Sequence, residues 1–264
     1  MIANYHTHTW RCKHATGTER EYIENAIAGG MRILGFSDHT PMPYVNGYVS
    51  NTKMDINQLE DYVDTILELK GEYRNDIEIH LGLEVEYYPK YFDELLKIIG
   101  HYPIEYFLLA QHYLGNEIDD FFSGTPTDSE EQLARYCRQS QEALEMGCFT
   151  YFAHPDLLNF TGDAVVYDSW MRKLCCCAKN MDIPLEINFL GIWEGRHYPN
   201  LEFWKIAGEV GNTVIFGSDA HQAAKVWNPE ALSIAEKIVK KYNLKLIDTV
   251  PFRIPRSNID CVKL

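Results

Sequence analysis

The sequence predicts an α/β protein whose parallel strands curl into a barrel. Two observations predict this fold. Seven short runs rich in β-branched and aromatic residues recur along the chain, and longer amphipathic segments separate them. Strands that alternate with helices of this length form a parallel sheet with helices outside it. Seven repeats favour a closed or nearly closed barrel over an open, doubly wound sheet.

The expected strands are bounded by Gly, Pro or Asp residues, which end strands. They cover residues 2–9, 32–39, 78–88, 106–114, 150–156, 184–190 and 213–221. Residues 244–247 are expected to add a further strand, followed by a closing tail.

Apolar residues at spacings of three and four predict the helices. These lie at 56–72, 91–100, 167–182, 200–210 and 229–242. Two capping boxes, Thr18 with Glu21 and Thr127 with Glu130, predict further helix starts. In such a box the threonine accepts from the third backbone N–H, and the glutamate reaches back to the cap.

The composition fits a single domain over residues 1–264, because no repeat or Pro/Ser-rich linker divides the chain. The 24 Lys and Arg residues face 38 Asp and Glu residues, which gives a net charge of −14. This charge argues against nucleic acid as a partner, since nucleic-acid affinity comes largely from neutralised phosphates. No apolar run approaches the ~18 residues of a membrane span, and no secretory leader is readable. We therefore expect a cytoplasmic protein with no membrane partner.

Histidines are concentrated where the predicted strands end, and in an α/β barrel that end carries the active-site loops. The pairs His6-x-His8 and Asp219-x-His221 each project from one face of a strand, roughly 6 to 7 Å apart. Closing a barrel would make these two strands neighbours. The two pairs can therefore converge on one ion or on two neighbouring ions.

Carboxylates complete this set. Glu84 and Glu86 alternate on the third expected strand, where an inward glutamate is costly unless it is paired or bound to metal. Asp38 has two open interpretations: it orients a histidine from behind, or it caps the following turn.

These residues belong to a series of motifs that spans residues 6–221. The motifs are His6-Thr7-His8, His14, Ser37-Asp38-His39, Gly82-Leu83-Glu84, Gln111-His112, Ala153-His154-Pro155 and Gly217-Ser218-Asp219-Ala220-His221. Taken together, they resemble the PHP (polymerase and histidinol phosphatase) superfamily, most closely its stand-alone histidinol-phosphate phosphatases.

The resemblance implies a distorted (β/α)7 barrel of the TIM type that holds a centre of three divalent metal ions. The first ion would take His6, His8, Glu84 and Asp219; the second would take Glu84 as a bridge, with His112 and His154; the third would take His14, His39 and His221. An imidazole-rich shell suits Zn, Fe or Mn better than Mg.

The implied activity is hydrolysis of L-histidinol phosphate to L-histidinol and inorganic phosphate by a hydroxide bridging two of the ions, with Glu84 and Asp219 as the key catalytic carboxylates. Arg196 is the candidate phosphate clamp, because a guanidinium matches the oxygens of phosphate. Asp156 and a metal-bound water are both candidates for protonating the leaving group. Asp156, Glu186 and Glu194 are candidates for meeting the substrate's ammonium. A second arginine, usual in these phosphatases after the His-Pro-Asp segment, is missing from residues 157–160.

Three kinds of alternative remain open at this point: another phosphoester substrate, another class of enzyme, and a protein without catalysis. The substrate could be another phosphomonoester, a phosphotyrosyl protein, or a phosphodiester or nucleotide. An amidohydrolase-type deaminase or amidase also begins with His-x-His, but it would leave three histidines without a role. Finally, the chain could be a metal-binding barrel without catalysis. No pattern in the sequence indicates an oligomeric state.

Overall fold

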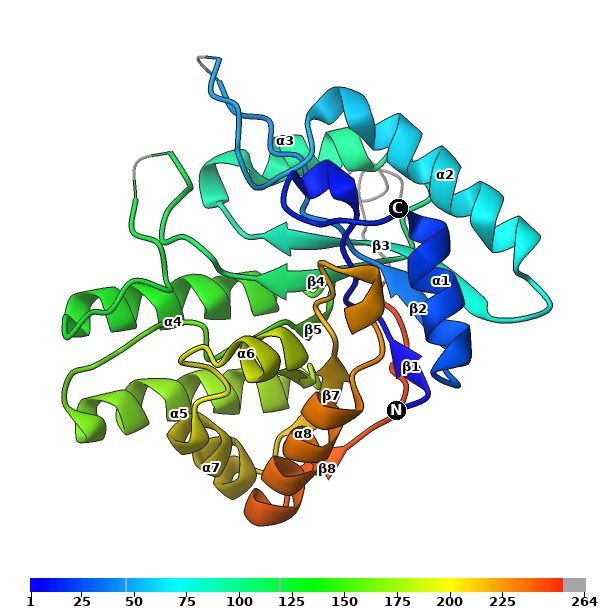
Figure 1. The fold of residues 1–264 in the computed structure, drawn as a ribbon. Coiled ribbons are helices and arrows are strands. Elements are labelled where there is room, and N and C mark those ends of the chain that lie inside the picture. Colours follow the sequence, from blue (N-terminus) through cyan, green and yellow to red (C-terminus); the bar gives the residue numbers. More distant parts are fainter. Residues whose placement is uncertain (46, 119, 254–264) are drawn as a thin grey trace, which may run out of the picture.

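Within the described residues, eight parallel strands form one curved sheet, in which the order of the strands is their order in the sequence (Figure 1). The computed structural model describes residues 1–45, 47–118 and 120–253. The strands are β1 (Ala3–Asn4), β2 (Ile33–Phe36), β3 (Glu78–Glu86), β4 (Tyr106–Ala110), β5 (Phe149–Phe152), β6 (Leu185–Asn188), β7 (Thr213–Gly217) and β8 (Lys245–Leu246). The predicted α/β class is confirmed.

All seven predicted strands are present, and the additional strand expected at 244–247 forms β8. The predicted strands run too far at their carboxyl ends. β4, for example, ends at Ala110 rather than Leu114, and β2 ends at Phe36 rather than His39. The chain leaves the sheet there because the polar residues that follow turn inward to face one another instead of continuing the strand pairing.

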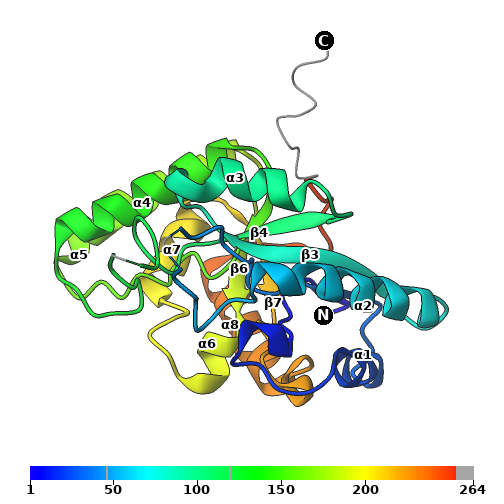
Figure 2. The same cartoon turned by 90° about the horizontal axis from the view of Figure 1, so that it is seen from above.

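The helices lie around the outside of the sheet (Figure 2). They are α1 (Glu19–Ala28), α2 (Leu59–Glu72), α3 (Pro89–Ile99), α4 (Glu130–Glu145), α5 (Ala164–Asn180), α6 (Phe189–Glu194), α7 (Leu201–Val210) and α8 (Pro229–Tyr242). The five helices predicted from periodicity are confirmed. The short α6 replaces the end of the strand predicted at 184–190. No helix of the described part is long and apolar enough to cross a membrane.

One of the two predicted capping boxes is confirmed. Thr18 and Glu21 make both reciprocal hydrogen bonds at the start of α1. The box at Thr127 is wrong, because Ser129 caps α4 and accepts from the backbone N–H of Gln132. Two overlapping patterns of the same kind occur in this segment, and the structure uses the second.

The barrel is open rather than closed. β1 has two residues, and among the described strands it pairs with β2 alone. Beyond β1, the backbone N–H of His8 donates to the carbonyl of Ala220 at 3.0 Å, and Thr7 forms an isolated bridge with the same residue. This short contact brings the continuations of β1 and β7 side by side, although β8 occupies the lower part of the edge of β7.

Two apolar cores lie on opposite faces of the sheet, as alternation along β4 shows. Phe107 and Leu109 belong to the larger core, which the helices cover, whereas Tyr106 and Leu108 belong to a smaller core inside the curve. The segment after β8, red in Figure 1, packs against this inner core through Phe252, as expected of a closing tail. The part of the expected tail beyond residue 253 lies outside the described residues.

Tyr106 fills the interior of the barrel below the strand ends. Its hydroxyl donates to the carbonyls of Tyr5 and Phe36, at 2.7 and 3.1 Å. A Cβ atom on Gly82 would lie 2.3 Å from its ring, so glycine is needed there. This packing provides a rigid floor for the polar side chains above it.

Candidate metal centre

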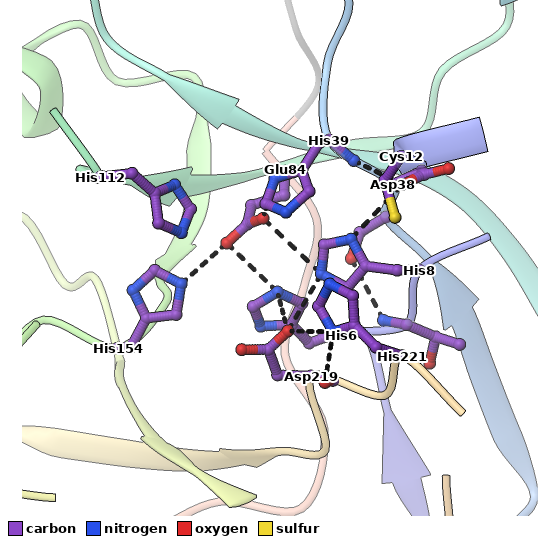
Figure 3. A network of polar contacts seen from close by, with 12 residues as sticks. His6, His8, Cys12, Asp38, His39, Glu84, His112, His154, Asp219 and His221 are labelled. Atoms are coloured by element: carbon purple, nitrogen blue, oxygen red, sulfur yellow. Dashed lines mark hydrogen bonds and ion pairs between the residues drawn. The ribbon is translucent and has the colours of Figure 1, made fainter. Parts of the chain in front are cut away.

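Histidines and carboxylates from six strands meet at the carboxyl end of the barrel (Figure 3). His6 and His8 follow β1, His39 follows β2, Glu84 lies on β3, His112 follows β4, His154 follows β5, and Asp219 and His221 follow β7. The structure therefore brings together side chains that are more than two hundred residues apart in the sequence.

Asp219 lies between the two histidines of the first motif. Its Oδ1 is 3.0 Å from Nε2 of His8 and 3.5 Å from Nε2 of His6. One potential ligand atom from each of these residues lies within 4.8 Å of the other two. All three side chains are buried, so this group matches the first predicted ligand set except for Glu84.

Glu84 joins that group to two further histidines. Its Oε1 is 2.9 Å from Nε2 of His154 and 3.2 Å from Nε2 of His6. Its Oε2 is 2.8 Å from Nδ1 of His39 and 3.7 Å from Nε2 of His8. Burial raises the pKa of this carboxyl, but nearby histidines outweigh burial and hold its pKa well below the usual range. The geometry fits a bridging carboxylate.

The third predicted set is also brought together. One ligand atom from each of His14, His39 and His221 lies within 4.8 Å of the others. His14 is exposed, so this group lies at the solvent side of the cluster. The buried thiol of Cys12 lies near His8 and His221, and its pKa is raised by burial.

His112 lies at the edge of the cluster. Its ring centroid is 4.9 Å from that of His154 and 5.2 Å from that of His39. Among the described residues it belongs to no group of three with converging ligand atoms. Its Nδ1 lies 3.3 Å from Oε1 of Glu86.

Most of these histidines have an oxygen atom behind the ring. Nδ1 of His6 lies 2.8 Å from Oε1 of Glu186, and Nδ1 of His8 lies 3.4 Å from Oδ1 of Asp38. Nδ1 of His14 and of His221 face the carbonyl oxygens of Cys12 and Asp219, at 2.7 and 3.0 Å. Such contacts fix the tautomer and leave Nε2 free to bind a metal ion.

Asp38 has both of the roles left open by the sequence. In addition to its contact with His8, its Oδ1 accepts from the backbone N–H of His39 at 2.8 Å. The hydroxyl of Thr9 donates to its other oxygen. The carboxylate thus holds a histidine in place and shapes the turn after β2.

Glu186 is part of the support for the cluster and does not line the cavity. One of its oxygens contacts His6, and the other accepts from the backbone N–H of His154 and from Asn188, each at 3.0 Å. Asn188 also donates to Asp219 at 3.0 Å. Glu186 therefore supports His6 instead of meeting the substrate's ammonium, the role that the sequence suggests. Its alternation with Asn188 on β6 is the signal by which sequence reasoning could have found the supporting pair.

Two of the candidate ligands have unusual backbone conformations. His154 has φ +30° and Asp219 has φ +48°, in the left-handed region that non-glycine residues seldom occupy. Such strain persists where the surroundings enforce it, and it concentrates at functional sites.

These residues fit a cluster of divalent transition-metal ions. Nε2 of His6, His8 and His221 and Oε2 of Glu84 are buried without a hydrogen bond of acceptable geometry. Buried polar atoms are normally satisfied, and a bound cation would satisfy these. The ligand atoms are nitrogen and carboxylate oxygen, a combination that suits Zn, Fe or Mn.

A cavity of about 280 Å³ opens onto the cluster. It is lined by His14, Thr16, His39, Thr52, Lys53, Glu86, His112, Tyr113, Phe122, Leu157, Leu190, Trp193, Glu194, Arg196, Tyr198, Asp219, His221 and Gln222. Arg196 donates to Glu194 at 2.6 Å and to the hydroxyl of Tyr198 at 2.9 Å. The sequence-predicted phosphate clamp therefore lies beside the candidate ligands.

Asp156 lies outside the cavity and contacts the start of α7. Its Oδ2 accepts from the backbone N–H of Asn200 at 2.6 Å and from the indole of Trp204 at 3.0 Å. It lies outside the set of described residues that line the cavity. Burial raises its pKa to about 6. The carboxylate anchors the start of α7, and we do not carry it forward as a candidate acid.

A model of the PHP domain matches residues 4–189 of the chain. The chain belongs to the PHP domain family. The resemblance predicted from the histidine motifs is therefore confirmed.

Two relatives of this PHP domain match most of its length. A probable histidinol-phosphatase from Deinococcus radiodurans is 29% identical over 232 residues, covering 85% of this chain and 88% of that protein. A histidinol-phosphatase from Bacillus subtilis is 32% identical over 253 residues, covering 84% of this chain and 94% of that protein.

The fold matches a solved structure. The crystal structure of histidinol phosphate phosphatase from Lactococcus lactis, complexed with zinc, L-histidinol and phosphate, is similar with a TM-score of 0.74 at 19% identity. The match covers 95% of this chain and 97% of that one. At this identity, the likeness establishes the fold of the PHP domain.

Gly217 makes room for Glu186 and gives a test of the support behind His6. A Cβ atom there would lie 1.7 Å from Oε1 of Glu186. We expect Gly217→Ala to displace this carboxylate and to weaken zinc binding about 10- to 100-fold, the usual cost of losing such a contact. Competition with a chromophoric chelator measures the affinity. Gly71→Ala, in α2 with open space around the added carbon, is the control. Equal affinities of the two variants would contradict the role of Glu186.

Proposed function

We propose that this PHP domain is a metal-dependent phosphomonoesterase that hydrolyses L-histidinol phosphate to L-histidinol and inorganic phosphate. The observation that carries the proposal is the convergence of the histidine and carboxylate groups on one small cavity that also contains Arg196. The names of the relatives from D. radiodurans and B. subtilis support the choice of substrate.

In this proposal three ions bind to the ligand sets implied by the family resemblance. His6, His8, Glu84 and Asp219 hold the first, Glu84, His112 and His154 the second, and His14, His39 and His221 the third. Bound divalent ions make hydroxide available near neutral pH and neutralise charge on phosphoryl oxygens. Glu84 orients two of the sites relative to each other, because its two oxygens face different histidines.

The other residues of the cavity would bind the ester. Arg196 offers a planar guanidinium suited to two phosphate oxygens. Glu194, whose Oε2 already accepts from Arg196, holds that guanidinium at the cavity wall and adds negative charge near a cationic leaving group. Leu157, Leu190 and Trp193 form an apolar surface beside it.

The size of the cavity supports a small substrate. Ligand pockets generally measure roughly 300 to 1,000 Å³, and this cavity of about 280 Å³ is at the lower limit. A small phosphomonoester is therefore favoured over a phosphotyrosyl protein or a nucleic acid.

The ligand sets predict three metal ions per chain. After loading with zinc and removal of free metal, we expect elemental analysis to find three ions in the wild type. Glu84→Ala removes the carboxylate shared by two sites, so its content should fall by at least one ion. Glu105→Gln, at the opposite end of β4 where Glu105 pairs with Lys70, should retain all three. A wild-type value near one would contradict the proposed centre.

Substrate choice is tested with three esters assayed in parallel. We expect kcat/KM for L-histidinol phosphate to exceed that for p-nitrophenyl phosphate by at least about 100-fold, because remote binding energy is realised at the transition state. Bis(p-nitrophenyl) phosphate should be slower still. Glu84→Ala should abolish all three activities. Faster turnover of the diester would exclude a monoesterase, and a fully loaded protein inactive on every ester would indicate a non-catalytic barrel.

Arg196 should act on substrate binding rather than on metal binding. A hydrogen bond to a charged group contributes about 1.5 to 3 kcal/mol, so Arg196→Ala should raise KM for L-histidinol phosphate by about 10-fold or more. Its metal content should equal that of the wild type. Arg172→Ala, which alters a surface ion pair on α5, is the matched control. Unchanged kinetics of Arg196→Ala would assign this arginine to the surface.

A further inference from the structure

Lys53 is a buried cation on the wall of the cavity. It lies in the segment between β2 and α2, it is 3% exposed, and its side chain lines the cavity with His112 and Glu86. Sequence patterns do not single it out, because no motif surrounds it. A lysine is seldom buried unless its charge is paired.

Two carboxylates pair with this lysine. Nζ lies 2.5 Å from Oε1 of Glu86 and 2.9 Å from Oε2 of Glu117. The side chains of these carboxylates are also almost fully buried, at 2% and 4% exposure. The lysine therefore links β3 to the segment that follows β4.

Glu86 connects the lysine to the metal centre. The same Oε1 that contacts Lys53 lies 3.3 Å from Nδ1 of His112. The hydroxyl of Tyr88 donates to the other oxygen. Glu86 thus stands behind His112 as a carboxylate that is held by Lys53 at one oxygen and by Tyr88 at the other.

Glu117 connects the lysine to residues that precede it in the chain. It accepts from the hydroxyls of Tyr44, Ser50 and Tyr48, at 2.9, 2.6 and 3.2 Å. These three residues and Lys53 all lie in the segment 44–53. One carboxylate therefore fastens this segment to the chain after β4, near His112.

The contacts argue against direct binding of substrate phosphate by Lys53. Its two neighbouring carboxylates outnumber its own charge, so the three side chains together favour a cation over an anion. Buried ion pairs contribute little net stability compared with apolar packing of the same shape. A positioning role explains why charged groups occupy this wall.

We propose that Lys53 is a positioning residue, which holds Glu86 against His112 and couples the orientation of that candidate metal ligand to the segment 44–53. This inference rests on the proposed metal centre. Lys53 acts through Glu86 on one side, where it affects metal binding, and through Glu117 on the other, where it affects how firmly the cavity wall at Thr52 and Lys53 is held.

Zinc affinity, measured by chelator competition without any substrate, tests the first connection in a double-mutant cycle. Loss of a contact behind a metal ligand costs about 10- to 100-fold in affinity, and we expect a loss of this size in Lys53→Met and in Glu86→Gln. Because Lys53 acts through Glu86, adding Lys53→Met to Glu86→Gln should lower zinc affinity further by less than about threefold. Lys53→Arg should restore affinity to within about threefold of the wild type, since it retains the charge.

Glu117→Gln is the matched control for the second connection. It leaves the contact between Lys53 and Glu86 in place, so zinc affinity should stay within about threefold of the wild type, well below the loss expected behind a ligand. KM for L-histidinol phosphate should rise instead, because segment 44–53 is less firmly held.

Two outcomes would overturn the inference. One is unchanged zinc affinity in Lys53→Met or Glu86→Gln; if KM rises in Lys53→Met at the same time, the lysine is assigned to substrate contact. The other is additive losses in the double variant. The double variant leaves no unpaired carboxylate beside His112. Its comparison with Glu86→Gln therefore decides the matter even if Lys53→Met alone does not fold. A wild type that binds no zinc would refute the proposed centre instead.

Discussion

The polar end of the barrel depends on the contacts between the carboxylate of Glu84 and the histidines around it. This carboxylate lies within 4 Å of nitrogen atoms from four histidines, which follow three different strands. An isolated buried carboxylate is strongly disfavoured, so its position is tolerated because positive charge or hydrogen-bond donors surround it. Divalent cations would supply that charge most directly. The strained backbones of His154 and Asp219 indicate that the surrounding structure enforces this arrangement.

A second set of polar groups surrounds the candidate ligands and holds them in place. Glu186, Asp38 and Glu86 each stand behind one histidine. Below them, Tyr106 closes the interior with an aromatic ring that the small residue Gly82 accommodates. The arrangement thus has three layers, from an apolar floor through orienting carboxylates to the candidate ligands. Each layer depends on the one beneath it for its geometry.

The sequence predicted the fold class, the strands and the ligand candidates because these leave local patterns. Alternating apolar runs mark the strands, and His6-x-His8 or Asp219-x-His221 mark one face of a strand end. No local pattern marks Lys53 or Glu117, because their contact joins two loops that are far apart in the sequence. Asp156 follows a histidine motif, which suggests a place in the site, yet its carboxylate accepts from Trp204. The predicted strands extend beyond the observed carboxyl ends because side chains that turn into a site continue the same alternation.

The pairing of Thr7 with Ala220 joins the two extremes of the cluster. His6 and His8 emerge early during synthesis on the ribosome, whereas Asp219 and His221 emerge only after four fifths of the chain has been made. Contacts between such distant segments form late in folding. A nascent or truncated polypeptide that lacks Asp219 and His221 therefore presents only part of the candidate ligand set.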